Sequence, residues 1–292
     1  MLSGDGTRLA VRVHGPQGAP TVVLVHGLGL SAGSWEQVVT RLEGSHRVVL
    51  YDLRGHAGSG RAATGDYGIA AHAADLDAVL ATTVDPSQRA VLVGHSLGGQ
   101  IILHRARRSL EGISGVVFAG SVGSVVSLPG LPGQGPPAPL RALVRRSWLA
   151  LLLALAHLAR AVRRAPGPLL DRMGRWAIFA PRDPAAAVTT ARRDFLRTDA
   201  GVLARTAFAS LEEDGSLLAR GLRVPALILY GDCDSEISAE DVQLLASRLP
   251  DPHVVTLCGL GHMMPMTHPD VVAGHVADWV RRTAEPAPSA TG

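Results

Sequence analysis

Short runs of aliphatic and β-branched residues alternate along this chain with glycine-rich or polar turns and then with stretches that suit helices. Seven of these runs are strand candidates, at residues 9–13, 21–25, 47–52, 90–94, 115–119, 226–230 and 254–257. The alternation is typical of a mostly parallel sheet that helices cover on both faces. We therefore predict an α/β fold with a doubly wound sheet. Ligands bind at the carboxyl ends of the strands in such sheets, so the turns that follow the strands are where chemistry is expected.

The alternation stops after Ser121 and resumes near Val224, which indicates a large insertion. A Pro/Gly-rich connector at 129–139 opens this insertion, and an arginine-rich segment that suits helices follows. We predict a core made of residues 1–122 and 222–283, a connector and helical cap at 123–221, and a disordered tail at 284–292.

The most apolar part of the insertion, residues 148–162, is flanked by pairs of arginines. It is shorter than the roughly 20 apolar residues that a membrane-spanning helix needs. We predict a buried or lid helix here, and the alternative is a helix that contacts lipid or an apolar substrate.

Charge is distributed unevenly, and this decides how the net charge of +3 is interpreted. Residues 141–197 hold 12 arginines and three aspartates, whereas the rest of the chain holds more acidic than basic residues. Aromatic residues make up only 4% of the chain, so the stacking surfaces of single-strand binders are missing. We expect no nucleic-acid partner. The basic cap could make weak contact with a membrane surface or with an anionic part of a substrate.

Several chemistries are excluded by residue types that are missing. The 28 basic residues are all arginines, and asparagine is absent as well, which excludes lysine Schiff bases, a pyridoxal-phosphate anchor, a phosphate-loop lysine and a papain-like Cys/His/Asn set. No histidine pair has the spacing of a zinc site, so we expect no metal and no cofactor. Cys233 and Cys258 are too few for a disulfide framework and are expected to be buried thiols. The first 15 residues lack the features of a secretory signal, so we expect a cytoplasmic location, with peripheral membrane contact as an alternative.

The strongest motif is Gly-His-Ser-Leu-Gly-Gly at 94–99, between a predicted strand and a predicted helix. A nucleophilic serine on a sharp strand-to-helix turn needs small residues two positions before and after it, because larger side chains would collide with the neighbouring strand and helix. Gly94 and Gly98 meet this requirement around Ser96. We predict that Ser96 is a nucleophile.

A serine nucleophile needs a base and an acid that orients the base. Asp234 and His262 each follow a predicted strand, at the same edge of the sheet as Ser96. The order Ser, Asp, His is the one associated with this kind of serine turn. Asp232 is an alternative to Asp234 as the orienting acid.

Four motifs together resemble the α/β-hydrolase family. They are His26-Gly27-Leu28-Gly29 after a strand, Asp52-Leu53-Arg54-Gly55-His56 after the next, the serine motif, and the Gly-His pair that ends in His262. The resemblance implies an oxyanion hole formed by the backbone N–H groups of Leu28 and Leu97, a role for His26 in shaping that loop, and a cap at the insertion. It also assigns the acid to Asp234 rather than Asp232. One departure is Ala57, which stands where the family usually has glycine.

Other residues near these turns are candidates for lining a substrate pocket, although core packing or a role in the turn is equally open for several of them. They are His26, Gly27, Trp35, His95, Trp148 and Met263.

These residues predict a serine hydrolase that cleaves a carboxylic ester, thioester or lactone of a lipophilic substrate through an acyl-enzyme. Three alternatives stay open: a serine-dependent C–C bond hydrolase, a biosynthetic lyase, cyclase or acyltransferase on the same fold, and a non-catalytic binding or membrane-docking protein.

Overall fold

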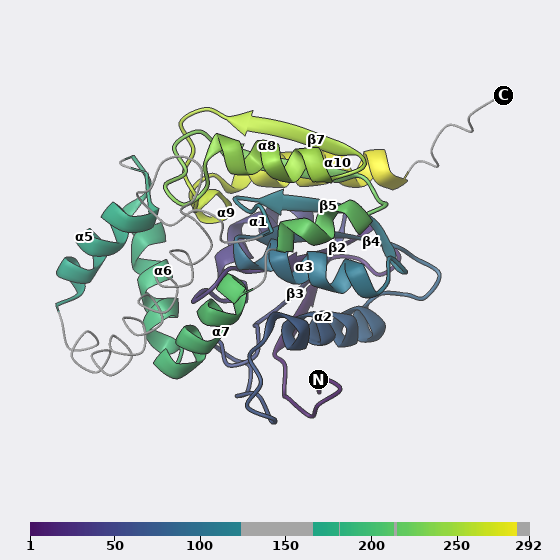
Figure 1. The fold of residues 1–292 in the computed structure, drawn as a ribbon, viewed down its shortest axis with the longest axis horizontal. Helices are drawn as coiled ribbons and strands as arrows, with labels where there is room; N and C mark the ends of the chain where they lie inside the picture. The colour runs from purple at the N-terminus through teal and green to yellow at the C-terminus, as the bar shows by residue number, and fades with distance from the viewer. Residues whose placement is uncertain (124–165, 181, 213–214, 285–292) are drawn as a thin grey trace.

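The computed structural model of the protein describes residues 1–123, 166–180, 182–212 and 215–284 (Figure 1). Its strands are β1 (Val11–His14), β2 (Thr21–Val25), β3 (Arg47–Tyr51), β4 (Ala90–His95), β5 (Ile113–Ala119), β6 (Ala226–Gly231) and β7 (Pro252–Leu257). They form one sheet in the order β1-β3-β2-β4-β5-β6-β7, in which β1 is antiparallel to β3 and the other pairs are parallel. The predicted fold class is confirmed.

Helices cover both faces of the sheet. One face packs against α1 (Glu36–Leu42), α9 (Met264–Thr267) and α10 (Pro269–Ala284), and the other against α2 (Ile69–Thr83), α3 (Leu97–Arg108) and α8 (Ala239–Arg248) (Figure 1). Side chains of β2 alternate between two apolar clusters: Val22 and Leu24 lie in the cluster with Trp279, and Val23 and Val25 lie in the cluster with Leu76. Since both faces are buried, β2 is apolar at all positions after Thr21.

The first strand starts later than predicted. Residues 9–13 were expected to form it, but β1 runs Val11–His14. The Leu9 N–H donates to the Met1 carbonyl and the Ala10 N–H donates to Ser59 Oγ, so these two residues do not pair with β3 through their amides. The other predicted strands agree with the structure to within two residues at each end.

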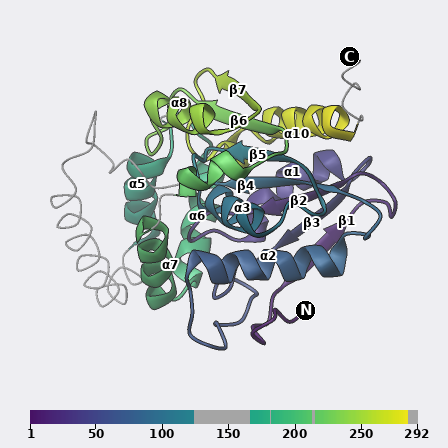
Figure 2. The same ribbon diagram turned by 45° about the vertical axis from the view of Figure 1, so that its right-hand side comes forward.

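Three described helices lie between β5 and β6 in the chain: α5 (Gly167–Ile178), α6 (Ala185–Arg197) and α7 (Ala200–Glu212). They gather at one end of the sheet, where the strands have their carboxyl ends (Figure 2). Short 3₁₀ helices also occur at Ala32–Trp35 and Gly215–Gly221. The predicted division into core and cap stays a prediction, because residues 124–165, with the apolar segment 148–162, lie outside the described residues. Of the predicted tail, Ala284 ends α10, and the remainder is not described.

Within the described ranges, no helix combines the length and the apolar character that crossing a membrane requires.

Candidate active site

Ser96 lies at a sharp turn between β4 and α3. Its backbone has φ 51° and ψ −120°, a conformation that L-residues rarely adopt. The glycines on either side are required by space: a Cβ on Gly94 would lie 2.5 Å from the carbonyl carbon of Gly98, and a Cβ on Gly98 would lie 2.3 Å from the Val25 carbonyl oxygen. The steric reason predicted for the two small residues therefore holds. The turn presents Ser96, which is partly exposed, at the carboxyl edge of the sheet.

Two backbone N–H groups next to Ser96 are free to bind an anion. Leu97 is the first residue of α3, and Leu28 lies in the loop after β2; neither N–H donates a hydrogen bond within the described residues. The two loops are close, since a Cβ on Gly27 would lie 3.1 Å from Ser96 Cβ. The N-terminus of α3 adds its partial positive charge. This arrangement can stabilise an oxyanion that forms beside Ser96.

Buried histidines hold the Leu28 loop in place. His26 accepts a hydrogen bond from the Leu53 N–H at Nε2 (3.0 Å) and donates from Nδ1 to the Gly27 carbonyl (2.8 Å). His56 accepts from the Gly29 N–H at 3.2 Å. Burial lowers the pKa of His26 to about 3 and also lowers the pKa of His56, so both rings are neutral and can accept these bonds. Both histidines therefore fix the conformation of the loop that carries Leu28.

His262 and Asp234 come together as predicted. The imidazole Nδ1 lies 3.0 Å from Asp234 Oδ2 and 3.2 Å from Oδ1, and both side chains are buried. Asp234 Oδ1 also accepts from the backbone N–H groups of Glu236 and Ile237, at 2.8 and 3.0 Å. Burial works to raise the pKa of Asp234, but the charge of His262 and these hydrogen bonds outweigh it and lower the pKa. The carboxylate is thus fixed to orient the imidazole with its Nδ1–H toward Asp234.

A second carboxylate at His262 was not predicted from the sequence. Glu236 Oε2 lies 3.3 Å from His262 Nε2, the nitrogen opposite the one that faces Asp234. Among the hydrogen bonds of the described residues, none joins Ser96 Oγ to His262. Burial lowers the pKa of His262, but Glu236 and then Asp234 outweigh burial and raise that pKa to about 9. The only sequence signal for this contact is an acidic residue two positions after Asp234.

His95 packs against His262 and forms a hydrogen bond with its backbone. Its Nε2 donates to the His262 carbonyl at 3.0 Å, and the centres of the two rings are 5.1 Å apart. Burial lowers the pKa of His95 to about 3, so the ring is neutral. Trp35 is fully buried in the core and meets the His95 ring edge-on. Of the two roles open for Trp35, the structure places it in core packing behind His95.

Asp232 does not face the imidazole. Its Oδ1 accepts a hydrogen bond from the Gly259 N–H at 2.6 Å, which joins the loop after β6 to the loop after β7. The prediction that both cysteines are buried is wrong: Cys233 and Cys258 are exposed thiols. Cys258 directly follows β7, the edge strand of the sheet, where alternate residues face solvent, and Cys233 lies in the loop after β6.

The described helices of the insertion pack against the site. Met263, next to His262, is buried in an apolar cluster with Leu30 of the Leu28 loop and Phe179 and Val188 of the insertion. Ser31 Oγ donates to the buried Asp194 carboxylate of α6 at 2.6 Å. Apolar surface and one strong hydrogen bond thus hold α6 over the loop that carries Leu28. Trp148, the remaining pocket candidate, lies outside the described residues.

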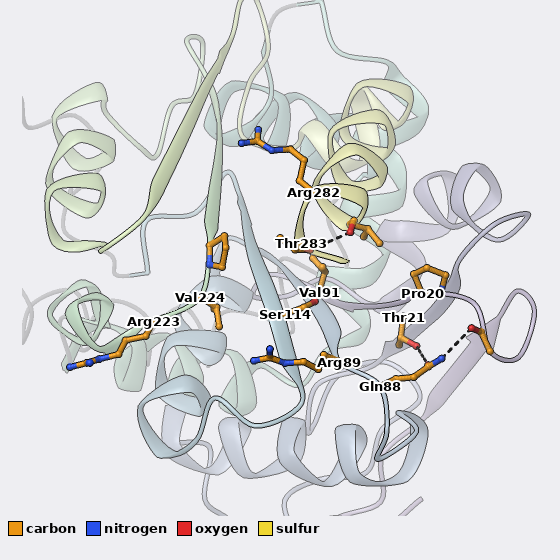
Figure 3. Close-up of a pocket in the computed structure, with 13 residues that line it drawn as sticks. Pro20, Thr21, Gln88, Arg89, Val91, Ser114, Arg223, Val224, Arg282 and Thr283 are labelled. Carbon is orange, nitrogen blue, oxygen red and sulfur yellow. Dashed lines mark hydrogen bonds between the residues drawn. The ribbon is translucent and has the colours of Figure 1, made fainter. Parts of the chain in front are cut away.

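A separate hollow lies far from these residues. It has a volume of about 620 Å³ and is lined by residues at or just before the starts of β2, β4, β5 and β6, among them Thr21, Arg89, Ser114 and Arg223. Ser96, Asp234 and His262 follow the opposite ends of the strands. Figure 3 shows that the guanidinium groups of Arg89, Arg223 and Arg282 lie well apart from one another. This hollow is therefore not the place where the predicted site residues meet.

In the part of the chain that the structure describes, no three His, Cys, Asp or Glu side chains are grouped so that they could hold a metal ion.

Comparison with known proteins places the chain in a family. The model of the alpha/beta hydrolase family matches residues 22–275. The chain belongs to this family. It is 26% identical to the uncharacterized hydrolase YugF of Bacillus subtilis over 280 residues, which cover 95% of this chain and 96% of that protein.

Two further proteins are similar to this chain over nearly their whole length. A pimeloyl-[acyl-carrier protein] methyl ester esterase of Yersinia enterocolitica is 26% identical, covering 91% of this chain and 95% of that one. The solved structure of the esterase RhEst1 from Rhodococcus sp. ECU1013 has a TM-score of 0.76 and 27% identity, covering 96% of this chain and 97% of that one. The resemblance that the motifs carry is confirmed.

Proposed function

We propose that this hydrolase cleaves a carboxylic ester, thioester or lactone of a lipophilic substrate through an acyl-enzyme on Ser96. The observation that carries the proposal is the grouping of Ser96 on its strained turn, the free N–H groups of Leu28 and Leu97, and the Asp234–His262 pair at one edge of the sheet. The esterases among the relatives support the reaction type.

In the first half of the reaction, Ser96 Oγ attacks the carbonyl carbon while His262 Nε2 takes the hydroxyl proton. The electrons of the carbonyl double bond move to oxygen, and the N–H groups of Leu28 and Leu97 stabilise the resulting oxyanion. The bond to the leaving alcohol then breaks, and His262 gives its proton to the departing oxygen. Water repeats the sequence and releases the acid. No cofactor is needed for any of these steps.

The apolar surroundings suit a lipophilic acyl group. Leu30, Phe179 and Met263 belong to one cluster that adjoins both the Leu28 loop and the residue after His262. Part of this cluster comes from the insertion, so the insertion would shape the acyl side of the pocket.

The test is hydrolysis of p-nitrophenyl esters with acyl chains from two to twelve carbons. Ser96→Ala is expected to lower kcat by at least about 10³-fold, because no other group supplies the nucleophile. Ser87→Ala is the matched control: Ser87 is exposed on the loop between α2 and β4, and the hydrogen bonds that its N–H and hydroxyl donate within the described residues go to Asp85. Hydrolysis that Ser96→Ala leaves unchanged would refute the proposal.

A further inference from the structure

The contact between Glu236 and His262 is held by the backbone around it. The Glu236 N–H donates to Asp234, and Ser238 and Asp241 form a reciprocal cap at the start of α8. The loop between Asp234 and α8 is therefore anchored at both ends. The loop carries one acidic residue, Glu236. Its side chain is 38% exposed, and its carboxylate lies beside Nε2 of the buried His262 imidazole.

The nitrogen that Glu236 faces is the one that handles the proton in the proposed mechanism. Since Nδ1–H is directed to Asp234, Nε2 must take the proton from Ser96 and pass it to the leaving oxygen. That oxygen has to come within hydrogen-bond distance of Nε2, about 3 Å. Because Glu236 Oε2 is itself 3.3 Å from Nε2, the leaving group must pass beside this carboxylate or displace it.

The segment that carries Glu236 is rich in acidic residues. Residues 232–241 contain five acidic residues and no basic one. Of these five residues, Asp234 pairs with His262 Nδ1, and Asp241 takes part in the cap at the start of α8. Among the described ion pairs, the partner of Glu236 is His262, and His262 is uncharged whenever it is ready to accept the Ser96 proton, so the carboxylate charge is then available to a ligand.

We propose that Glu236 lines the leaving-group side of the active site and selects substrates by the charge of the alcohol that they release. Cationic alcohols, such as quaternary amino alcohols, are favoured over neutral ones of the same shape, and anionic alcohols are disfavoured. This inference rests on the proposed function, since it needs Ser96 and His262 to carry out acyl transfer.

The experiment compares three butyrate esters that share the acyl group and differ in the charge of the alcohol: the choline ester, its neutral isostere the 3,3-dimethylbutyl ester, and the 3-sulfopropyl ester. Because all three use the same base, any effect of Glu236 on the protonation of His262 cancels in the ratio of their kcat/KM values. In Glu236→Gln, the choline-to-neutral ratio is expected to fall roughly three- to tenfold, as for a charge lost a few ångströms from the ligand at partial exposure. The sulfopropyl-to-neutral ratio is expected to rise.

Two further variants make the result specific. Glu240→Gln removes an acidic side chain that is exposed in the first turn of α8, and it should leave both ratios unchanged. Glu236→Asp keeps the charge and should keep most of the preference for choline. If Glu236→Gln does not fold, Glu236→Ala measured against Glu236→Asp provides the same comparison.

The outcomes separate the two proposals. Ratios that do not change in Glu236→Gln, or that change equally in Glu240→Gln, overturn the leaving-group role while Ser96-dependent hydrolysis upholds the proposed function. Hydrolysis of the three esters that persists in Ser96→Ala overturns both.

Discussion

Replacing Glu236 by glutamine removes one of two carboxylates beside the imidazole of His262, and we expect the enzyme to work at lower pH as a result. The pKa of His262 is raised to about 9, with Glu236 the larger raising cause and Asp234 the second. Among the described residues, the other titratable group in contact with the ring is His95 of β4, which is neutral because burial lowers its pKa to about 3. Only an unprotonated His262 can accept the Ser96 proton. In the free wild-type enzyme kcat/KM should therefore rise with pH up to an inflection near 9.

The size of the shift follows from the 3.3 Å separation of Glu236 Oε2 and His262 Nε2. Because Glu236 is 38% exposed, we use the dielectric constant of water, which makes the interaction about 1.3 kcal/mol and the change in pKa about one unit. This is a lower limit, since a drier site strengthens the interaction. At pH 7 the unprotonated fraction, and with it kcat/KM relative to its plateau, should increase about tenfold.

The assay is kcat/KM for a neutral p-nitrophenyl ester between pH 5.5 and 10, for wild type, Glu236→Gln and the control Glu240→Gln. The account predicts an inflection about one unit lower in Glu236→Gln and an unmoved inflection in the control. An inflection in Glu236→Gln within about 0.3 pH units of wild type would refute the electrostatic reasoning, because removing a unit charge at this distance must change the pKa of His262.

Three predictions concern stability, each measured by urea denaturation. Ser96→Gly should be about 1 kcal/mol more stable than Ser96→Ala, because glycine adopts the strained conformation of this turn freely, and neither variant should hydrolyse esters. Ser31→Ala should cost about 1–3 kcal/mol, because the buried Asp194 carboxylate loses its hydroxyl donor. Arg54→Ala should cost about 3–5 kcal/mol, because it leaves the fully buried Asp75 carboxylate without its two guanidinium bonds.

Contrary results would have specific meanings for these three variants. Equal stability of the two Ser96 variants would mean that the turn stores no strain. A Ser31→Ala variant as stable as wild type would show that α6 is held by apolar contacts alone. For Arg54, the control is the double variant Arg54→Met/Asp75→Leu. It should regain much of the stability that Arg54→Ala loses, because the buried Asp75 carboxylate is removed together with the guanidinium.

The sequence predicted the central strands and the serine turn well, for physical reasons. β2 and β4 are buried on both faces, so their uninterrupted apolar runs are unambiguous, and Gly94 and Gly98 are set by collisions with backbone atoms. Edge strands carry a weaker signal. β1 is only partly buried, and its predicted start at residue 9 was two residues early because the amides of Leu9 and Ala10 bond elsewhere.

The features that the sequence did not predict depend on where loop side chains point. Spacing indicates that Asp234 and His262 share an edge of the sheet, but it does not reveal that Glu236 turns back onto Nε2 while Asp232 turns to Gly259. The sequence also did not predict that Cys258 and Cys233 are exposed: the apolar run before Cys258 lies on an edge strand, and Cys233 lies in the loop after β6. Such orientations are fixed by contacts between loops that are far apart in sequence.

The most direct test of the account is to identify the residue that reacts as the nucleophile. The protein is treated with a fluorophosphonate that carries an alkyl chain, and the adduct is located by mass spectrometry of its peptides. The account predicts a single adduct on Ser96, absent in Ser96→Ala and formed much more slowly in His262→Ala. An adduct on another residue, or ester hydrolysis by a protein whose Ser96 stays unmodified, would contradict the central claim.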